Sequence, residues 1–170
     1  MPQGQENSGK TAPRRPGRPR AHEAPLTRER ILEEALRLVD AQGVAGLSMR
    51  ALAHGLGVDP MADYHHLPNK NCVLRGVVSR VFAKLEVAHL PDAPWPTQVR
   101  AFAQAYLTLA RAHPRLVLHL VTDLGAGGRA VLQATERLYE ALAAAGLAPR
   151  QIAVASDLVV DYLHGVALAE

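Results

Sequence analysis

The fold is decided by residues 47–70, which read LSMRALAHGLGVDPMADYHHLPNK. Ser48 is a good N-cap, and the apolar residues after it recur at helical spacing, so we expect a short helix from about residue 49 to residue 55. Gly57 should end this helix, because the residue just past a helix end often needs a positive φ, which glycine adopts without a Cβ penalty. The first half of the stretch therefore predicts a short helix and a tight corner.

A second short helix should follow this corner directly. Asp59 can accept hydrogen bonds from the free N–H groups of the next turn, and Pro60 at the first helical position loses no bond that it would have made. Pro68 should close this helix, which we place at roughly 60–66. Two short helices joined by a glycine corner form a helix-turn-helix, and such a motif lays its second helix in the major groove of DNA.

Over residues 27–85 the chain resembles the TetR/AcrR family of bacterial transcriptional regulators. The resemblance rests on a first helix that ends at a glycine, the pattern LSMRALAxGLGVxPMAxYHHLPNK and a long helix after it. It implies an all-α fold, with an N-terminal three-helix helix-turn-helix DNA-binding domain and a C-terminal helical ligand-binding and dimerisation domain. It also implies a sequence-specific transcriptional repressor that a small-molecule ligand releases.

The resemblance further implies which residues meet DNA. Tyr64 and Lys70 would contact phosphates, since a phenol can donate to a phosphate oxygen and a lysine at a helix N-terminus adds its charge to the exposed amides. The other residues of the second helix would face the groove or its walls, and its adjacent histidines point to different faces, which argues against a metal site there. The candidate DNA-binding residues are Ser48, Arg50, Pro60, Met61, Ala62, Tyr64, His65, His66 and Lys70, with Arg18 and Arg20 of an N-terminal arm.

Asp63 departs from the family's pattern, because it occupies a position where the family usually carries an apolar residue that points inward. An unpaired carboxylate there would be costly to bury and unfavourable near phosphate. Either Asp63 is paired, for example by Arg50, or the corner has a different geometry.

The basic charge of the chain lies in its N-terminal half. The 170 residues carry a formal net charge of +3, and residues 1–90 hold 13 Lys and Arg against 9 Asp and Glu, whereas residues 91–170 hold 6 against 7. A polyanionic partner should therefore bind the first half. The single cysteine, Cys72, excludes a disulfide within the chain and fits a reducing cytoplasm.

Residues 1–25 are rich in Pro, Gly, Gln and Arg and have little to bury, so they should form a disordered basic arm. Within this arm, the segment RRPGRPR at 14–20 could enter an A·T-rich minor groove, or it could be a solvated tail that attracts DNA without reading its sequence. We expect residues 26–70 to form the DNA-binding domain, and residues 71–170 to form a linking helix with the regulatory and dimerisation domain.

The remaining elements read as helices, and no strand pattern occurs. Thr27 should cap a first helix that ends near Gln42, and Asn69 should cap a long helix that runs to about His89. Four more helices are expected at 97–112, with Thr97 as its cap, and at 114–124, 129–145 and 150–169.

The last two helices are apolar around much of their circumference, so they must be covered on more than one side. In so short a chain the simplest cover is a second copy, and these helices should form an isologous four-helix interface. The candidate interface residues are Leu138, Leu142, Leu158, Val159, Tyr162, Leu163 and Val166. A two-fold homodimer implies a roughly palindromic operator in double-stranded DNA.

The resemblance also implies a cavity for a small apolar or amphipathic ligand. Binding of this ligand would shift the helix of residues 71–89 and move the two DNA-binding domains of the dimer apart. Candidate pocket residues carry polar tips on apolar faces, although each is more often a core or rim residue than a ligand contact. They are Trp95, Phe102, Tyr106, His113, His119 and Asp123. The sequence stops at Glu170 inside an apparent helix, which leaves two alternatives: a C-terminal segment is missing, or the pocket is reduced.

The rival hypothesis is a metal-binding helical bundle or a metal-responsive regulator. Asp157, Asp161 and His164 share one helix face, and the Asp-x-x-His spacing is typical of a carboxylate-bridged site. The paired helix supplies only Glu136 and Glu140 and no second acid-x-x-His, so we expect no metal. No Ser-His-Asp set, P-loop or Gly-x-Gly-x-x-Gly motif is present, so neither an enzyme nor a cofactor is expected.

A membrane partner is not expected either. No apolar run approaches the roughly 18 residues that a membrane span needs, and the N-terminus lacks the apolar core of a signal peptide. The sequence therefore predicts a cytoplasmic location.

Overall fold

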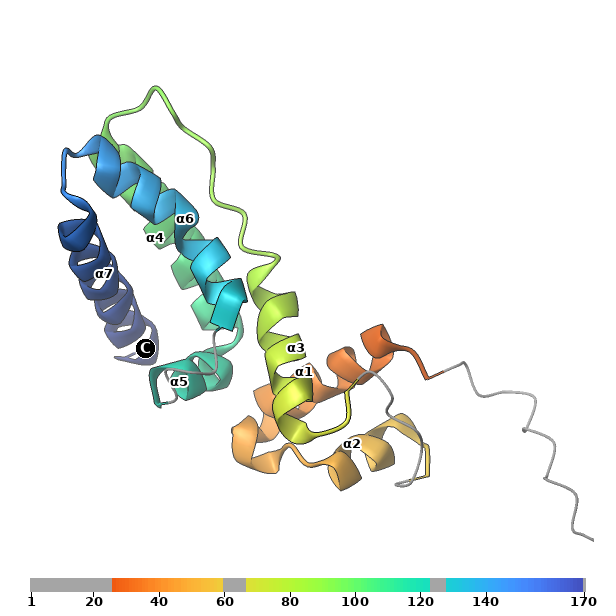
Figure 1. The fold of residues 1–170 in the computed structure, drawn as a ribbon. Helices are drawn as coiled ribbons and strands as arrows, with labels where there is room; N and C mark the ends of the chain where they lie inside the picture. Colours follow the sequence, from red (N-terminus) through yellow and green to blue (C-terminus); the bar gives the residue numbers. More distant parts are fainter. Residues whose placement is uncertain (1–25, 60–66, 123–127, 170) are drawn as a thin grey trace, which may run out of the picture.

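The computed structural model describes residues 26–59, 67–122 and 128–169, and these residues form seven α-helices without a strand (Figure 1). The predicted all-α fold is confirmed. The helices are α1 (Arg28–Gly46), α2 (Met49–Leu56), α3 (Lys70–Phe82), α4 (Trp95–Ala112), α5 (Pro114–Thr122), α6 (Gly128–Ala144) and α7 (Pro149–Ala169). The predicted arm at 1–25 and the predicted recognition helix at 60–66 lie outside the described residues.

A cap begins α1, and a glycine breaks it near its end. The Thr27 side chain accepts a hydrogen bond from the Arg30 N–H at 3.3 Å, as expected of an N-cap. Gly43 has a φ of +73°, which interrupts the helix at the predicted place, and one further turn carries the chain to Gly46. The face that turns inward buries Ile31, Leu32, Ala35, Leu38 and Val39.

The second helix and its corner have the predicted local structure. Ser48 Oγ accepts a hydrogen bond from the Ala51 N–H at 3.0 Å, so Ser48 is the N-cap of α2. Gly57 lies in the left-handed region with a φ of +70°, and the Val58 N–H donates to the Ala53 carbonyl at 3.0 Å. Val58 is also partly buried against the core, which locks the corner as expected.

The three N-terminal helices approach closely because glycines lie where they cross. A Cβ on Gly76 of α3 would come within 2.6 Å of Leu32 Cδ2 on α1, and a Cβ on Gly55 of α2 would overlap the Glu34 carboxylate of α1. Arg37 Nε donates to Glu34 Oε2 at 2.8 Å, and this hydrogen bond holds the pKa of Glu34 below its usual value. Helix α1 is thus the common support of α2 and α3.

The prediction that the helix after Asn69 runs to about His89 is wrong, because α3 ends at Phe82. In the segment that follows, Leu85 and Val87 are partly buried against the core, whereas Lys84, Glu86 and Ala88 are exposed. This alternation has the period of two that is typical of extended chain rather than the helical period of 3.6. Short apolar runs do not distinguish the two periods, which explains the error.

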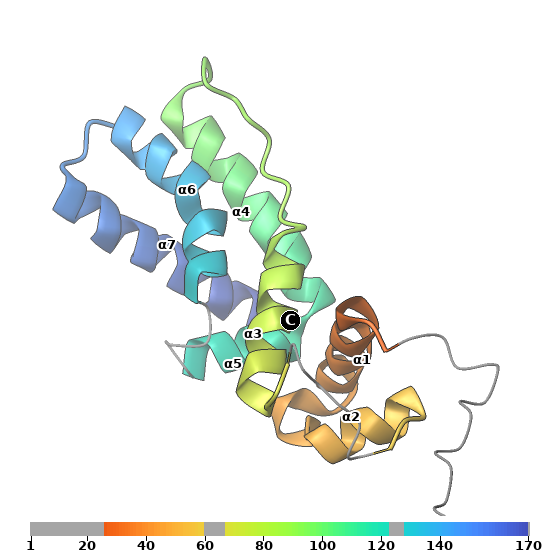
Figure 2. The ribbon, with the colours of Figure 1, turned by 45° about the vertical axis from the view of Figure 1, so that its right-hand side comes forward.

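We call α1 to α3 the first module and α4 to α7 the second module. In the second module, α4, α6 and α7 lie side by side, and α5 lies at the end nearest to α1 (Figure 1, Figure 2). The predicted cap at Thr97 is wrong, since α4 begins at Trp95 and the Thr97 N–H already donates to the Pro94 carbonyl at 2.9 Å. Prolines suit this first turn because its N–H groups have no partner inside the helix. One buried core runs through both modules, where the rings of Phe82 and Tyr106 lie 6.2 Å apart.

Candidate nucleic-acid interface and ligand cavity

A trough between α1 and α2 contains Ser48 and Arg50, two of the candidate DNA-binding residues. It has a volume of about 600 Å³ and is lined by Arg37, Leu38, Gln42, Ser48, Arg50, Ala51, His54, Gly55 and Val58. Arg37 is engaged by Glu34, which offsets its charge, whereas Arg50 is exposed in the first turn of α2. Helix α2 therefore presents a cation beside its N-terminal N–H groups, an arrangement that favours a phosphate.

Lys70, predicted to contact a phosphate, makes a structural contact inside the protein. Its Nζ donates to the Val44 carbonyl at 2.7 Å, which ties the start of α3 to the turn that follows the break in α1. Asn69 caps the same helix as predicted, with Oδ1 accepting from the Cys72 N–H at 2.9 Å. A lysine ammonium has three N–H donors, so Lys70 keeps capacity for a phosphate.

Several predicted site residues lie outside the described residues. In residues 60–66, which we call the recognition segment, they are Pro60, Met61, Ala62, Tyr64, His65 and His66, together with Asp63. Elsewhere they are Arg18, Arg20 and Asp123. The two alternatives for Asp63 therefore stay open.

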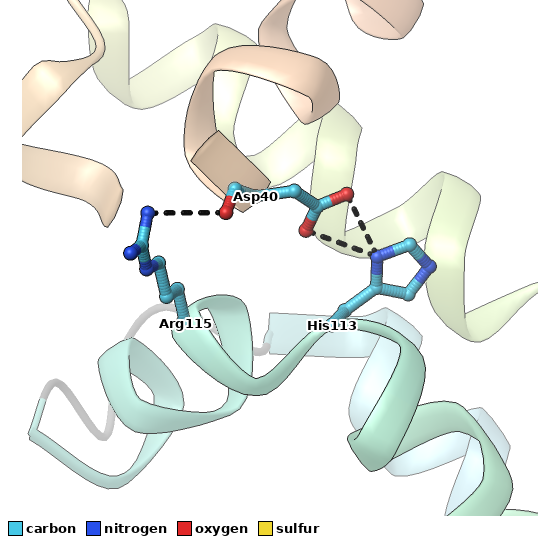
Figure 3. Close-up of polar contacts among 3 residues, drawn as sticks. All are labelled: Asp40, His113 and Arg115. Carbon is cyan, nitrogen blue, oxygen red and sulfur yellow. Dashed lines mark hydrogen bonds and ion pairs between the residues drawn. The ribbon is translucent and has the colours of Figure 1, made fainter. Parts of the chain in front are cut away.

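His113, predicted to line the pocket, instead joins the two modules (Figure 3). Its Nδ1 lies 3.1 Å from both carboxylate oxygens of Asp40 on α1. Arg115, in the first turn of α5, donates to the carbonyls of Asp40, at 3.2 Å, and Ala41. These carbonyls lie just before the break at Gly43, where the helix leaves carbonyl groups without an intrahelical partner. Asp40, His113 and Arg115 form what we call the α1–α5 joint.

We expect Arg115→Ala or Asp40→Asn to lower the free energy of unfolding by about 1 kcal/mol or less, because the joint is partly exposed to water. The double variant should be less destabilised than the sum of the two, since both changes act on one network. Urea denaturation measures these values, and Arg100→Ala on the exposed side of α4 is the matched control. If Arg115→Ala behaves like Arg100→Ala, the joint makes no contribution to stability.

The other predicted pocket residues divide between core and surface. Phe102 is fully buried and stacks on Tyr106, with ring centroids 5.8 Å apart, so it is a core residue. Trp95 is 45% exposed at the start of α4, and His119 is partly buried on α5, and neither lines the cavity described below. Of the five predicted pocket residues that the structure describes, Tyr106 is the one that lines it.

A cavity of about 370 Å³ lies among α4, α5, α6 and α7. Its lining consists of Tyr106, Leu120, Val131, Leu132, Thr135, Tyr139, Ser156, Asp157, Val160, Asp161 and His164. Sequence reasoning missed most of this set. Thr135 and Ser156 are the buried polar residues among those described, and a small polar residue on a buried helix face is a signal that could have indicated them.

The floor of the cavity carries two coupled aromatic side chains. The Tyr106 hydroxyl lies 2.6 Å from His164 Nε2. Burial raises the pKa of Tyr106 well above its usual value, and the charge of Asp161 raises it further. Burial lowers the pKa of His164, and Asp161 opposes this effect. Both side chains are therefore neutral at neutral pH.

The predicted dimer interface needs correction at three positions. Leu138, Leu142 and Leu163 are buried in the core of their own subunit, because α4, α6 and α7 pack on one another there. Val159 and Val166 are partly buried. The residues that do present apolar surface include Leu132 (66% exposed) on α6, and Val154 (60%), Leu158 (65%) and Tyr162 (72%) on α7.

The sequence predicts no apolar run long enough to span a membrane, but helix α7 has the length and the apolar composition that such a span requires. Over a window of 18 residues its mean hydropathy is 1.5, and 17% of that window is buried. By length and composition alone it is the one described helix that meets the requirement for a membrane span, which is weak evidence for one. Its exposed apolar residues lie at i, i+4 and i+8, as in the contact stripe of a helical interface.

The described residues contain no group of three His, Cys, Asp or Glu side chains that could hold a metal ion. His164 Nδ1 and Asp161 Oδ1 are 3.9 Å apart, and the other ring nitrogen of His164 lies against Tyr106. The metal-binding hypothesis therefore gains no support from this part of the chain.

No protein-family model matches the chain. Among curated proteins, it is 31% identical over 146 residues to the HTH-type transcriptional repressor DrrR1 of Streptomyces coeruleorubidus, which covers 85% of the chain and 54% of the repressor. It is also 31% identical over 145 residues to an HTH-type transcriptional regulator of Saccharopolyspora erythraea, with 85% and 61% covered. The chain thus spans about half to three fifths of the length of these relatives.

Solved structures give the same result. A TetR-type transcriptional regulator of Streptomyces coelicolor superposes with a TM-score of 0.69 at 32% identity, covering 84% of the chain and 69% of that protein. ActR of the same organism, solved with actinorhodin, has a TM-score of 0.72 at 29% identity, covering 86% and 69%. BioQ, solved with its double-stranded DNA operator, has a TM-score of 0.73 at 25% identity, covering 85% and 86%. These proteins and the two relatives above include no named enzyme, in agreement with the sequence prediction.

Proposed function

The chain belongs to the TetR family of transcriptional regulators, and on that basis we propose that it is a cytoplasmic repressor that binds a DNA operator as a homodimer and is released by a small ligand. In this proposal, residues 26–70 form the DNA-binding domain. Residues 71–170 form the linking helix and the regulatory and dimerisation domain.

The local structure of α2 and of the glycine corner that follows it is the observation that carries the proposal. Ser48 caps α2, Gly57 turns the chain sharply, and Leu52 and Ala53 of α2 are buried in the core, where α2 packs on α1. Residues 60–66 follow this corner in the sequence, which is where a helix-turn-helix carries its second helix. BioQ, similar to this chain over 85% of its length, is a protein solved on operator DNA.

In the sequence, Arg50 precedes the recognition segment and Lys70 follows it. Each lies in the first turn of a helix whose N-terminal N–H groups favour an anion. We therefore assign both to phosphate contacts, which fix the position of the recognition segment without reading bases.

The exposed apolar stripe of α7 supports a homodimer. Val154, Leu158 and Tyr162 form an exposed apolar stripe on α7, whereas Leu163 and Ala167 of the same helix are buried in the core. Soluble proteins rarely leave such a surface uncovered. A second copy of α6 and α7 related by a two-fold axis would cover it and would place two recognition segments on one operator.

The α1–α5 joint gives a route from the ligand cavity to the DNA-binding domain. Leu120 of α5 lines the cavity, and Arg115 and His113, five and seven residues earlier in the chain, contact α1. A ligand that displaces α5 would act directly on the C-terminal end of α1, from which α2 continues. In this proposal the ligand favours the conformer in which the two recognition segments no longer fit one operator.

Selection of bound sites from random double-stranded DNA tests the proposed function. We expect enrichment of a roughly palindromic site with half-sites one helical turn apart, or a multiple of it. No enrichment at low ionic strength, where phosphate contacts are strongest, would contradict the proposal.

Arg50→Ala should weaken binding to operator and unrelated DNA by a similar factor, about tenfold, because the lost hydrogen bond is to a charged backbone group. The slope of log affinity against log salt should fall by about one for each lost contact. We choose Arg50 over Lys70 because Lys70 also holds the Val44 carbonyl. The matched control is Arg150→Ala, which removes another exposed arginine, at the start of α7. A changed base preference in Arg50→Ala would show that Arg50 reads bases instead.

A further inference from the structure

We propose that the cavity among α4, α5, α6 and α7 takes a cationic ligand: a small molecule with an aromatic or aliphatic body and a protonated amine. The inference rests on the proposed function only in treating this ligand as the effector. The cavity itself and the groups that line it are independent of DNA binding.

The walls of the cavity select an apolar body. Leu120, Val131, Leu132 and Val160 supply aliphatic surface, and Tyr106 and Tyr139 supply aromatic rings. A volume of about 370 Å³ is near the lower end of the range for small-molecule sites, so the ligand is of modest size.

The charge of the lining selects a cation. Asp157 and Asp161 lie one turn apart on α7, and no lysine or arginine among the described residues lines the cavity. Since Tyr106 and His164 are neutral, the charged groups around the ligand are the carboxylates of Asp157 and Asp161, and both are negative. Aromatic faces add a further attraction for an ammonium group.

The charge of Asp161 reaches the floor of the cavity even though its side chain is 80% exposed at the rim. It adds to the rise in the pKa of Tyr106 that burial causes, and it opposes the lowering of the pKa of His164. A charge that is felt at the buried phenol and imidazole is also felt by a ligand atom placed between them and the rim.

His164 supplies a second polar anchor. Its Nδ1 is buried and has no hydrogen-bond partner among the described residues. This nitrogen and Asp161 Oδ1 are 3.9 Å apart, so an ammonium nitrogen that lies beside the pair, about 2.9 Å from each atom, can donate one N–H to each of them. An ammonium has several donors and fits this position, whereas a carboxylate would meet Asp161 with a like charge.

Three fluorescent probes that share one body and differ in charge test the proposal. 1-Pyrenemethylamine is cationic at neutral pH, 1-pyrenemethanol is neutral and 1-pyrenecarboxylate is anionic. Titration of the full chain, followed by probe anisotropy, should show the amine binding about tenfold more tightly than the alcohol, with the carboxylate weakest. Equal or weaker binding of the amine than of the alcohol would overturn the assignment.

Asp161→Asn and Asp157→Asn locate the preference in the cavity. Each should reduce the advantage of the amine over the alcohol while leaving the affinity for the alcohol nearly unchanged, because the side-chain volume is kept. Asp92→Asn, an exposed acid before α4, changes the net charge equally and should leave the preference intact. If Asp92→Asn reduces the preference as much as Asp161→Asn does, the effect is general electrostatics and the site is wrong.

Operator binding of the same protein without probe separates this inference from the proposed function. DNA binding without an amine preference would overturn the ligand class alone. An amine preference that depends on Asp161, in a protein that binds no DNA, would support the cavity assignment and contradict the regulatory function.

Discussion

The double variant Leu158→Glu/Tyr162→Glu is expected to be a folded monomer that binds its operator at least about 100-fold more weakly than the unchanged chain. Both side chains are largely exposed in the single subunit, so the substitutions disturb little of its own core. In a two-fold dimer they would place charges of like sign in a desolvated apolar contact. Losing the dimer also removes the gain from linking two recognition segments, which amounts to two or more orders of magnitude.

Sedimentation velocity measures the association state of this variant, and circular dichroism shows whether it is folded. Leu90→Glu is the matched control, since it makes the same change at an exposed leucine in the linker between α3 and α4. A double variant that stays dimeric would place the interface elsewhere. A folded monomer that binds the operator as tightly as the unchanged chain would show that one recognition segment suffices.

Phe102→Ala is expected to lower the free energy of unfolding by about 3–5 kcal/mol, the range for removing a fully buried phenyl ring. The ring stacks on Tyr106, which in turn contacts Phe82 of α3 and His164 of α7. The vacated space therefore lies where both modules meet and cannot close by the movement of one side chain. Urea denaturation followed by circular dichroism gives the value.

Trp95→Ala is the matched control for Phe102→Ala. It also truncates an aromatic side chain of α4, but at a position that is 45% exposed. We expect this change to cost much less than the loss of Phe102. Similar losses from the two variants would contradict the assignment of Phe102 to the core.

The sequence predicts best where structure depends on near neighbours. Thr27, Ser48 and Asn69 each accept a hydrogen bond from an N–H three residues further on, and such caps are recognisable from residue type and order. Gly43 and Gly57 turn the chain with a positive φ, which is a property of the single residue. The resemblance to the family depends on the same local features.

The ligand cavity was harder to predict because it joins residues far apart in the chain. Tyr106 meets His164 across 58 positions, and no spacing in the sequence brings these two together. His113 shows the same effect, since its partner Asp40 lies 73 positions earlier and gives it a structural contact instead of a place in the pocket.

The sequence alone determined where α1, α2 and α3 begin and where the chain turns at Gly43 and Gly57. These features depend on hydrogen bonds over three or four residues and on the conformational freedom of glycine, and both act within the local chain. Tertiary packing alone decided which apolar residues of α6 and α7 are core and which are free for a partner. Leu163 and Tyr162 are neighbours on α7, yet the first is 3% exposed and the second 72%. Helical periodicity places them on different faces, but only the position of α4 and α6 determines which face is covered.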